Sequence, residues 1–170
     1  NKAYNTRVGA GPMPTELKDK IGDLIREKAR EYGATTGRPR RCGWFDVVAG
    51  RFSVQINGLS DIALTHLDIY DGFPTIKICT AYKFKGQALT SFPSDAAVLG
   101  QCQPIYEELD GWQESISGIR NFRKLPAQAH KYLSRLEDLL SCPISLVSTG
   151  PDRRQIIERN LKSEVRSPKS

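Results

Sequence analysis

The sequence predicts an α/β fold with mixed strands and helices. Segments with helical spacing of apolar residues alternate along the 170-residue chain with short runs rich in β-branched and aromatic residues, and no internal repeat is present. Hydrophobic residues make up 39% and charged residues 26% of the chain, a balance typical of globular proteins. A chain of this length can bury one domain-sized core.

Two helices are expected in the first third of the chain. Thr15 is the expected N-cap of a helix over residues 16–32, and Gly33 is suited to end it. The apolar residues at helical spacing in this segment are Leu17, Ile21, Leu24, Ile25 and Ala29. A second helix is expected over residues 46–57, although its β-branched content leaves a strand as the competing interpretation. The helical face comprises Val48, Phe52, Gln55 and Ile56.

Strand signals dominate from residue 62 onward, where the apolar runs are rich in Ile, Thr, Val and Tyr. The expected strands cover residues 62–67, 75–84, 105–109 and 143–147. Residues 126–140 predict an amphipathic helix with Pro126 in its first turn. Residues 158–170 are polar and basic, and we expect them to form a flexible tail behind a domain over residues 1–157.

The bulk properties exclude several functional classes. The formal net charge is +6, but the basic residues are spread over separate stretches, which favours small anionic ligands over nucleic acid. No apolar run approaches the ~20 residues that cross a bilayer, and no signal peptide pattern begins the chain. The four cysteines lie far apart, which indicates reduced thiols and a cytoplasmic location rather than a zinc site or a disulfide framework.

The most informative motif is the run Ala34-Thr35-Thr36-Gly37-Arg38-Pro39-Arg40-Arg41-Cys42-Gly43-Trp44, whose residues 34–40 we call the arginine loop. Arginine presents a planar fork of donors that fits carboxylate and phosphate oxygens. Threonine adds short donors, and Gly37 permits a close backbone approach to a ligand. This composition indicates a loop that holds a small polyanion, with a solvated basic turn as the alternative. Arg41 is expected to pair with a nearby carboxylate, and Trp44 to lie in the core.

This motif resembles the substrate loop of the adenylosuccinate synthetase family. Lys2–Leu17 resembles the segment just upstream in that family, with Met13 where Phe is more usual. Leu64-Thr65-His66-Leu67-Asp68 resembles its guanine motif Leu-Thr-Lys-Leu-Asp. The last two landmarks are Ile105-Tyr106-Glu107 with Gly111-Trp112, and Ser148-Thr149-Gly150-Pro151-Asp152-Arg153. The similarity covers about residues 2–157 and implies the C-terminal part of a P-loop-type synthetase fold, built around part of a larger central sheet.

The resemblance implies a GTP-dependent ligation of IMP and L-aspartate to adenylosuccinate, the first committed step of AMP synthesis. In this family GTP phosphorylates the O6 of IMP, and the aspartate amine then displaces the phosphate. The glycine-rich phosphate loop, the catalytic aspartate and histidine, and the Mg²⁺ ligands belong to the family's upstream part. We therefore expect no catalytic residue and no metal ligand in this chain, which would act within a complete homodimeric enzyme.

The resemblance also assigns binding residues. Those implied for aspartate are Ala34, Thr35, Thr36, Gly37, Arg38, Pro39 and Arg40. Those implied for IMP are Arg38, Val8 and Gly9. Those implied for GTP are Arg40, His66, Leu67, Asp68, Ser148, Thr149 and Gly150. The Asp68 carboxylate can accept hydrogen bonds from guanine N1–H and the exocyclic amine, a donor pair that adenine lacks. His66 stands where the family usually has lysine, so we expect altered GTP affinity or some pH dependence.

Two other functions remain open at this stage. The chain could be a non-catalytic nucleotide-binding or structural fragment that lacks the phosphate loop and the catalytic Asp and His. A reading frame that continues upstream into a Gly-Asp-Glu-Gly-Lys-Gly-Lys type loop would distinguish the ligase from this fragment. An RNA-binding module, the weaker idea, would require an affinity for polynucleotide above that for GTP and IMP.

Overall fold

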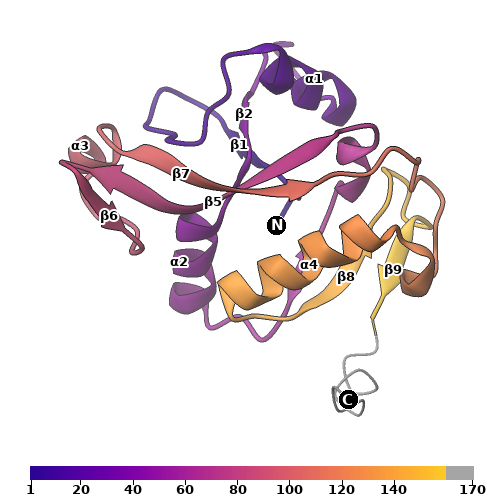
Figure 1. Ribbon diagram of the computed structural model, residues 1–170. Coiled ribbons are helices and arrows are strands. Elements are labelled where there is room, and N and C mark those ends of the chain that lie inside the picture. Colours follow the sequence, from indigo (N-terminus) through magenta and orange to yellow (C-terminus); the bar gives the residue numbers. More distant parts are fainter. Residues whose placement is uncertain (160–170) are drawn as a thin grey trace.

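The computed structural model describes residues 1–159, which form three small sheets with helices packed around them (Figure 1). β1 (Asn5–Arg7) pairs antiparallel with β2 (Arg41–Gly43). The second sheet holds β3 (Phe45–Asp46), β5 (Thr75–Phe84), β6 (Gln87–Leu89) and β7 (Gln103–Asp110). The third holds β4 (Ile62–Leu64), β8 (Ile144–Ser148) and β9 (Ile156–Glu158). The β3–β5 and β4–β8 pairs are parallel and the others antiparallel, which confirms the mixed α/β prediction.

Four α-helices and two 3₁₀ helices complete the described part of the chain: α1 (Lys20–Ala29), α2 (Val47–Asn57), η1 (Leu67–Tyr70), α3 (Ala96–Leu99), η2 (Phe122–Lys124) and α4 (Ala127–Leu140). In the view of Figure 1, α1 lies above the long β5–β7 pair, and α2 and α4 lie below it. Within residues 1–159, no helix is long and apolar enough to cross a membrane.

The main core is rich in aromatic side chains. Trp44 is 2% exposed and stacks on Tyr70 at a centroid distance of 5.7 Å, as expected of a core tryptophan. The hydroxyl groups of Tyr70 and Tyr132 both donate to the carbonyl oxygen of Ala3, over 2.9 and 2.6 Å. The N-terminal segment is therefore fixed to the centre of the core.

The first helix is shorter than the sequence predicts. It begins at Lys20 because Asp19, not Thr15, is the N-cap, accepting from the backbone N–H groups of Ile21 and Gly22. Upstream of Asp19, Glu16 forms a bridge with Gly43, so this stretch pairs with β2 instead of starting a helix. The helix ends at Arg30, which adopts φ 52°, three residues before the predicted stop at Gly33. Ile25 is buried, whereas Ile21 and Leu24 are exposed, so the predicted apolar face is only partly correct.

The second helix is confirmed, with Asp46 as its N-cap and Gly58 at φ 57° as its C-cap. Its predicted buried face is mostly wrong: Val48 is buried, but Phe52, Gln55 and Ile56 are exposed. Three of the four β-branched residues that left a strand open as an alternative, Val47, Val48 and Val54, form the buried face, and the fourth, Ile56, is exposed.

The later elements follow the predictions closely. The strand over residues 75–84 matches β5, and the helix predicted over residues 126–140 begins one residue later, as α4. The strand predicted over residues 62–67 is shorter, because His66 adopts a left-handed backbone and Leu67 starts η1. The predicted tail begins with Glu158, which lies in β9. Residues 160–170 of that tail lie outside the described part of the chain.

Candidate functional site

The arginine loop lies between α1 and β2 and is closed by local backbone hydrogen bonds. The N–H of Gly33 donates to the Arg38 carbonyl over 2.8 Å, and the N–H of Gly37 donates to the Gly33 carbonyl over 2.9 Å. Gly37 has φ 63°, a conformation that favours glycine. The tip, residues 34–39, is exposed. The backbone is thus shaped by local hydrogen bonds, including one of 3.4 Å from the Arg38 N–H to Thr36 Oγ1, while the Thr35 and Arg38 side chains lie on the exposed tip.

Arg40 is held much more firmly than the tip. Its N–H donates to the Glu31 carbonyl over 2.9 Å, and its carbonyl accepts from Arg26 Nε over 2.8 Å. Its guanidinium donates to Glu31 Oε2 over 2.9 Å. Both the main chain and the side chain of Arg40 are therefore fixed at the base of the loop.

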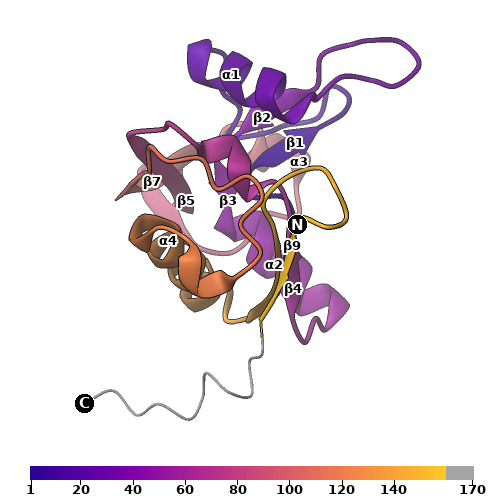
Figure 2. The same ribbon diagram turned by 90° about the vertical axis from the view of Figure 1, so that its right-hand side faces the viewer.

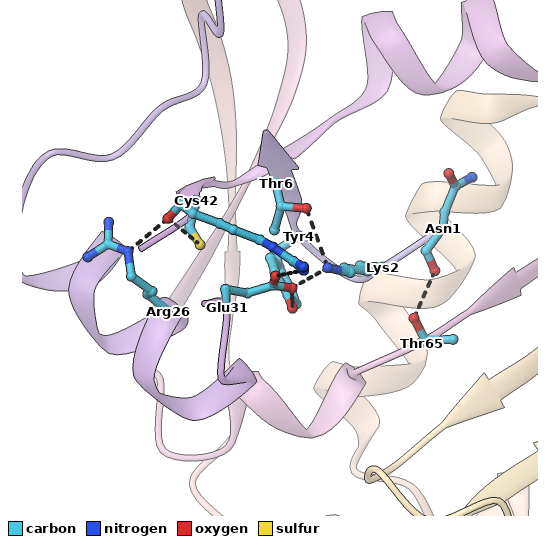
Figure 3. A network of polar contacts seen from close by, with 9 residues as sticks. Asn1, Lys2, Tyr4, Thr6, Arg26, Glu31, Cys42 and Thr65 are labelled. Carbon is cyan, nitrogen blue, oxygen red and sulfur yellow. Dashed lines mark hydrogen bonds and ion pairs between the residues drawn. The ribbon is translucent and has the colours of Figure 1, made fainter. Parts of the chain in front are cut away.

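Glu31 is a buried carboxylate at this base, with only 2% of its surface exposed. Figure 3 shows Lys2 and Tyr4 converging on it from the N-terminal segment, Lys2 by an ion pair and Tyr4 by a hydrogen bond of 2.5 Å. Burial alone raises the pKa of the Glu31 carboxyl, but the hydrogen bonds from Lys2, Tyr4 and Arg40 outweigh it and hold the pKa below its usual value of 4.5. Sequence reasoning did not single out Glu31, since its partner Lys2 lies 29 positions away.

The residues expected to line the IMP site lie beside the arginine loop. Thr6 pairs with Cys42 and Arg7 with Arg41 in the β1–β2 ladder, so Val8 and Gly9 follow directly at the end of the ladder where the arginine loop enters β2. Val8 is 78% exposed, and Gly9 adopts φ 87°. Arg41 donates to the Gly9 carbonyl over 3.0 Å and to Glu16 over 2.7 Å, which confirms the expected carboxylate partner.

The expected guanine motif is a tight turn after β4. His66 adopts φ 60°, and its backbone N–H donates to Ser148 Oγ over 2.9 Å. That bond joins the two segments expected to bind GTP, although 82 positions separate them. Leu67 is buried and anchors the turn in the core.

Asp68 carries an unusual carboxylate. Its Oδ1 atom is buried and accepts no hydrogen bond from residues 1–159. Desolvation by burial raises the pKa of this carboxyl above its usual value of 3.8. A buried acceptor without a partner is uncommon in proteins and costs free energy until a donor reaches it.

Thr149 and Gly150 are also buried, and Thr149 Oγ1 donates to the Ile119 carbonyl over 3.0 Å. A Cβ at Gly150 would lie 2.3 Å from the end of the Gln155 side chain, which would have to move to admit it. The loop after β8 is therefore closely packed against the segment that leads into β9.

Asp71 supports both guanine segments and was missed by sequence reasoning. Its carboxylate accepts from Trp112 Nε1 over 2.8 Å, from Ser115 Oγ over 2.9 Å and from the Ile116 N–H over 3.0 Å. The segment that it fixes continues to Ile119, which receives the Thr149 hydroxyl. This contact gives the Gly111-Trp112 landmark a structural role, because the Trp112 indole holds the Asp71 carboxylate next to η1. No local pattern marks Asp71, because these partners lie 41 to 45 positions away.

The N-terminal segment connects the two halves of the candidate site. Lys2 bridges to Thr65, Tyr4 packs edge-on against His66 at 6.1 Å between ring centroids, and Thr6 pairs with Cys42. In Figure 2 the arginine loop, drawn between α1 and β2, and the loop between β8 and β9 project on the same side of the molecule. The two halves of the candidate site are therefore held by one short segment, with the exposed tip of the arginine loop on the side where the guanine segments lie.

Metal-binding groups do not gather in the described part of the chain: residues 1–159 hold no cluster of three or more His, Cys, Asp or Glu side chains that could bind a metal ion. The cysteines Cys42, Cys79, Cys102 and Cys142 are free and buried. His130 stacks edge-on against Phe122 at 4.6 Å, which is a packing role.

The fold and the site together define an α/β protein that gathers cationic and carboxylate-bearing loops on one side. The family model described as adenylosuccinate synthetase matches residues 1–157. Similar curated proteins are the adenylosuccinate synthetases of Geobacter sulfurreducens (55% identical) and Heliobacterium modesticaldum (52% identical), each matched over 157 residues and 92% of this chain. A solved structure, fully ligated adenylosuccinate synthetase from Plasmodium falciparum, is 39% identical with a TM-score of 0.90 over 94% of this chain.

The chain belongs to the adenylosuccinate synthetase family. It spans just over a third of the length of these relatives: 36% of the Geobacter sulfurreducens protein, 37% of the Heliobacterium modesticaldum protein and 38% of the Plasmodium falciparum chain.

Proposed function

We propose that this chain supplies the aspartate, IMP and guanine recognition of a GTP-dependent ligase that joins IMP and L-aspartate to form adenylosuccinate. The family membership supports the reaction, and the Asp68 carboxylate supports the guanine part of it. Asp68 Oδ1 is a buried acceptor that receives no hydrogen bond from residues 1–159, at the motif where the family recognises guanine. This orphaned oxygen is the single observation on which the proposal depends most.

Aspartate presents two carboxylates, and the arginine loop offers the groups that bind them. The exposed hydroxyls of Thr35 and Thr36 and the Arg38 guanidinium project from one turn. Each charge-assisted hydrogen bond of this kind contributes ~1.5–3 kcal/mol. Such a loop contributes to catalysis by positioning the aspartate amine against the purine. The translational and rotational entropy of bringing the two reactants together is then lost on binding, which lowers the barrier of the reaction itself. Val8 and Gly9 lie at the same end of the β1–β2 pair and would line the IMP ribose together with Arg38.

Guanine recognition would come from two segments joined by the His66–Ser148 hydrogen bond. Asp68 accepts from the base, and the His66 imidazole, which the family usually replaces with lysine, stacks over it. Arg40 faces the GTP side and contributes positive charge there. On the family ground, Mg²⁺ and the reacting acid and base would be held by residues outside this chain, and we also expect a cytoplasmic homodimer.

A non-catalytic nucleotide-binding fragment is the second candidate, because the chain spans just over a third of its relatives. One assay separates the two functions. Adenylosuccinate formation is measured with IMP, GTP, aspartate and Mg²⁺, using the chain alone and the chain joined to the remaining part of the Geobacter sulfurreducens relative. We expect product only from the joined protein. Nucleotide binding by the joined protein without any product would favour the non-catalytic fragment, and product from the short chain would show that its own residues suffice for the chemistry.

A further inference from the structure

Glu31 is a buried carboxylate on which two cations from different parts of the candidate site converge. Arg40 reaches it from the base of the arginine loop over 2.9 Å. Lys2 reaches it from the N-terminal segment, whose Ala3 N–H donates to the Thr65 carbonyl over 2.8 Å. Thr65 immediately precedes His66 of the guanine motif. A continuous series of hydrogen bonds and ion pairs therefore runs from Arg40 through Glu31 and the N-terminal segment to the residue before His66.

We propose that Glu31 is a positioning residue that fixes the Arg40 guanidinium toward the GTP side and ties the arginine loop to the guanine motif. The inference rests on the proposed function, since it assigns a task within that site. A guanidinium has five N–H donors, and within residues 1–159 the structure assigns one of them to a partner, Glu31 Oε2. The remaining donors are left for a ligand, while the bond to Glu31 sets the direction in which they point.

The charge balance at Glu31 suits this task. One carboxylate faces two cations, so the group keeps a net charge of +1 beside a site for triphosphate and dicarboxylate ligands. Tyr4 donates a further hydrogen bond, of 2.5 Å, to the Glu31 carboxylate. Both carboxylate oxygens therefore have partners, although the single negative charge of Glu31 neutralises only one of the two cations. Burial of the carboxylate matters as well, because a charge pair held away from water is screened less than an exposed one. Glu31 thus orients a cation and leaves it cationic.

A structural pair elsewhere provides the matched control. Glu107 on β7 accepts two hydrogen bonds of 2.7 Å from Arg135 on α4, and neither residue belongs to the candidate site. Glu31→Gln and Glu107→Gln make the same chemical change, the loss of one carboxylate that binds an arginine. A difference in nucleotide kinetics between these variants therefore cannot come from the change of charge alone.

The experiment uses the joined protein that forms adenylosuccinate. We expect Glu31→Gln to raise the KM for GTP about 10- to 100-fold, the loss of one well-oriented charge-assisted contact, with a smaller change in kcat. Glu107→Gln should leave the KM for GTP within about twofold. In an Arg40→Leu background, Glu31→Gln should add no further increase in the KM for GTP, because Glu31 acts through Arg40. Glu31→Asp, which keeps the charge but shortens its reach, should lie between wild type and Glu31→Gln.

A purely structural Glu31 gives a different pattern. Its loss would lower the melting temperature and the fraction of active enzyme, and so kcat, while the KM for GTP stayed unchanged. That pattern, or additive effects of Glu31→Gln and Arg40→Leu on the KM, overturns the proposal. If Glu31→Gln does not fold, Glu31→Asp decides: a folded Asp variant with the wild-type KM for GTP overturns it equally. Absence of product from the unaltered joined protein overturns the proposed function and this inference together.

Discussion

Replacing Asp68 with asparagine tests the guanine assignment most directly. In the free protein Asp68 Oδ1 is already buried and receives no hydrogen bond from residues 1–159, so binding of guanine supplies donors to a carboxylate that has lost part of its hydration. Guanine offers two donors, N1–H and the exocyclic amine. The side chain introduced by Asp68→Asn keeps one acceptor, now uncharged, and points an amide N–H₂ at the guanine amine. One contact is therefore weakened, and the other is lost and replaced by a repulsion between two donors.

The magnitude follows from these contacts. A hydrogen bond to a charged group contributes ~1.5–3 kcal/mol, so the loss of one contact and the weakening of the other cost about 3 kcal/mol. This corresponds to a decrease of roughly 100-fold in the affinity for GTP. Xanthosine triphosphate carries a carbonyl where guanine has the amine, and the amide of the variant can donate to it. Asp68→Asn should therefore bind xanthosine triphosphate better than the wild type does.

The assay is steady-state adenylosuccinate formation by the joined protein, with GTP, ATP and xanthosine triphosphate as alternative donors. The inverted preference is the decisive result, because a variant that is merely less stable loses activity with every nucleotide alike. Asp68→Asn with an unchanged KM for GTP and no gain with xanthosine triphosphate would refute the assignment of Asp68 to the base. Asp61→Asn, at an exposed aspartate hydrogen-bonded to two serines, serves as the control.

Three further outcomes are expected. Asp71→Ala removes three hydrogen bonds and should lower the free energy of unfolding by ~3 kcal/mol and raise the KM for GTP, as measured by urea denaturation and kinetics; an unchanged KM would show that η1 keeps its place without this support. Arg41→Gln releases the Gly9 carbonyl and should raise the KM for IMP while that for GTP stays constant; equal effects on both would contradict a local role. Burial raises the pKa of Asp68, and guanine needs the ionised carboxylate. GTP affinity should therefore be full above that pKa and fall as pH decreases through it, at a higher pH than for an exposed aspartate. Calorimetric titration of GTP into the unaltered protein and into Asp68→Asn measures this pH dependence, which the variant should lack.

The sequence predicts this fold well where local chemistry decides the structure. Residues 75–84 form a strand as predicted because alternating β-branched and aromatic residues suit a half-buried sheet. The start of α1 was misplaced because Thr15 and Asp19 are both suitable N-caps, and only the pairing of Glu16 with Gly43 selects Asp19. The buried face of α2 was misjudged for a related reason: helical spacing identifies a face but not the neighbours that cover it.

The candidate site divides in the same way. The residues expected to touch ligands lie in short contiguous motifs, such as the arginine loop and His66–Asp68, so resemblance to the family can assign them from the sequence. The residues that support the site do not. Glu31 and Asp71 act through partners as far as 29 and 45 positions away, and the carboxylates look like ordinary surface acids in the sequence. Arg41 is the exception, since its expected carboxylate partner is present as Glu16, 25 positions away.

The N-terminal segment up to Arg7 explains how motifs that are distant in the sequence can serve one site. Ala3 receives the hydroxyls of Tyr70 and Tyr132, which fixes the segment in the core. From that anchor Lys2 extends to Glu31 and pairs with Thr65 before the guanine motif, and Thr6 pairs with Cys42 after the arginine loop. A segment this short can hold both loops only because its backbone pairs with both of them while its side chains reach in different directions. A shift of this segment would move Arg40 and the guanine motif together. Substitutions within the segment should therefore alter the KM values for aspartate and GTP in parallel, whereas substitutions at the loop tips should alter only one of these KM values.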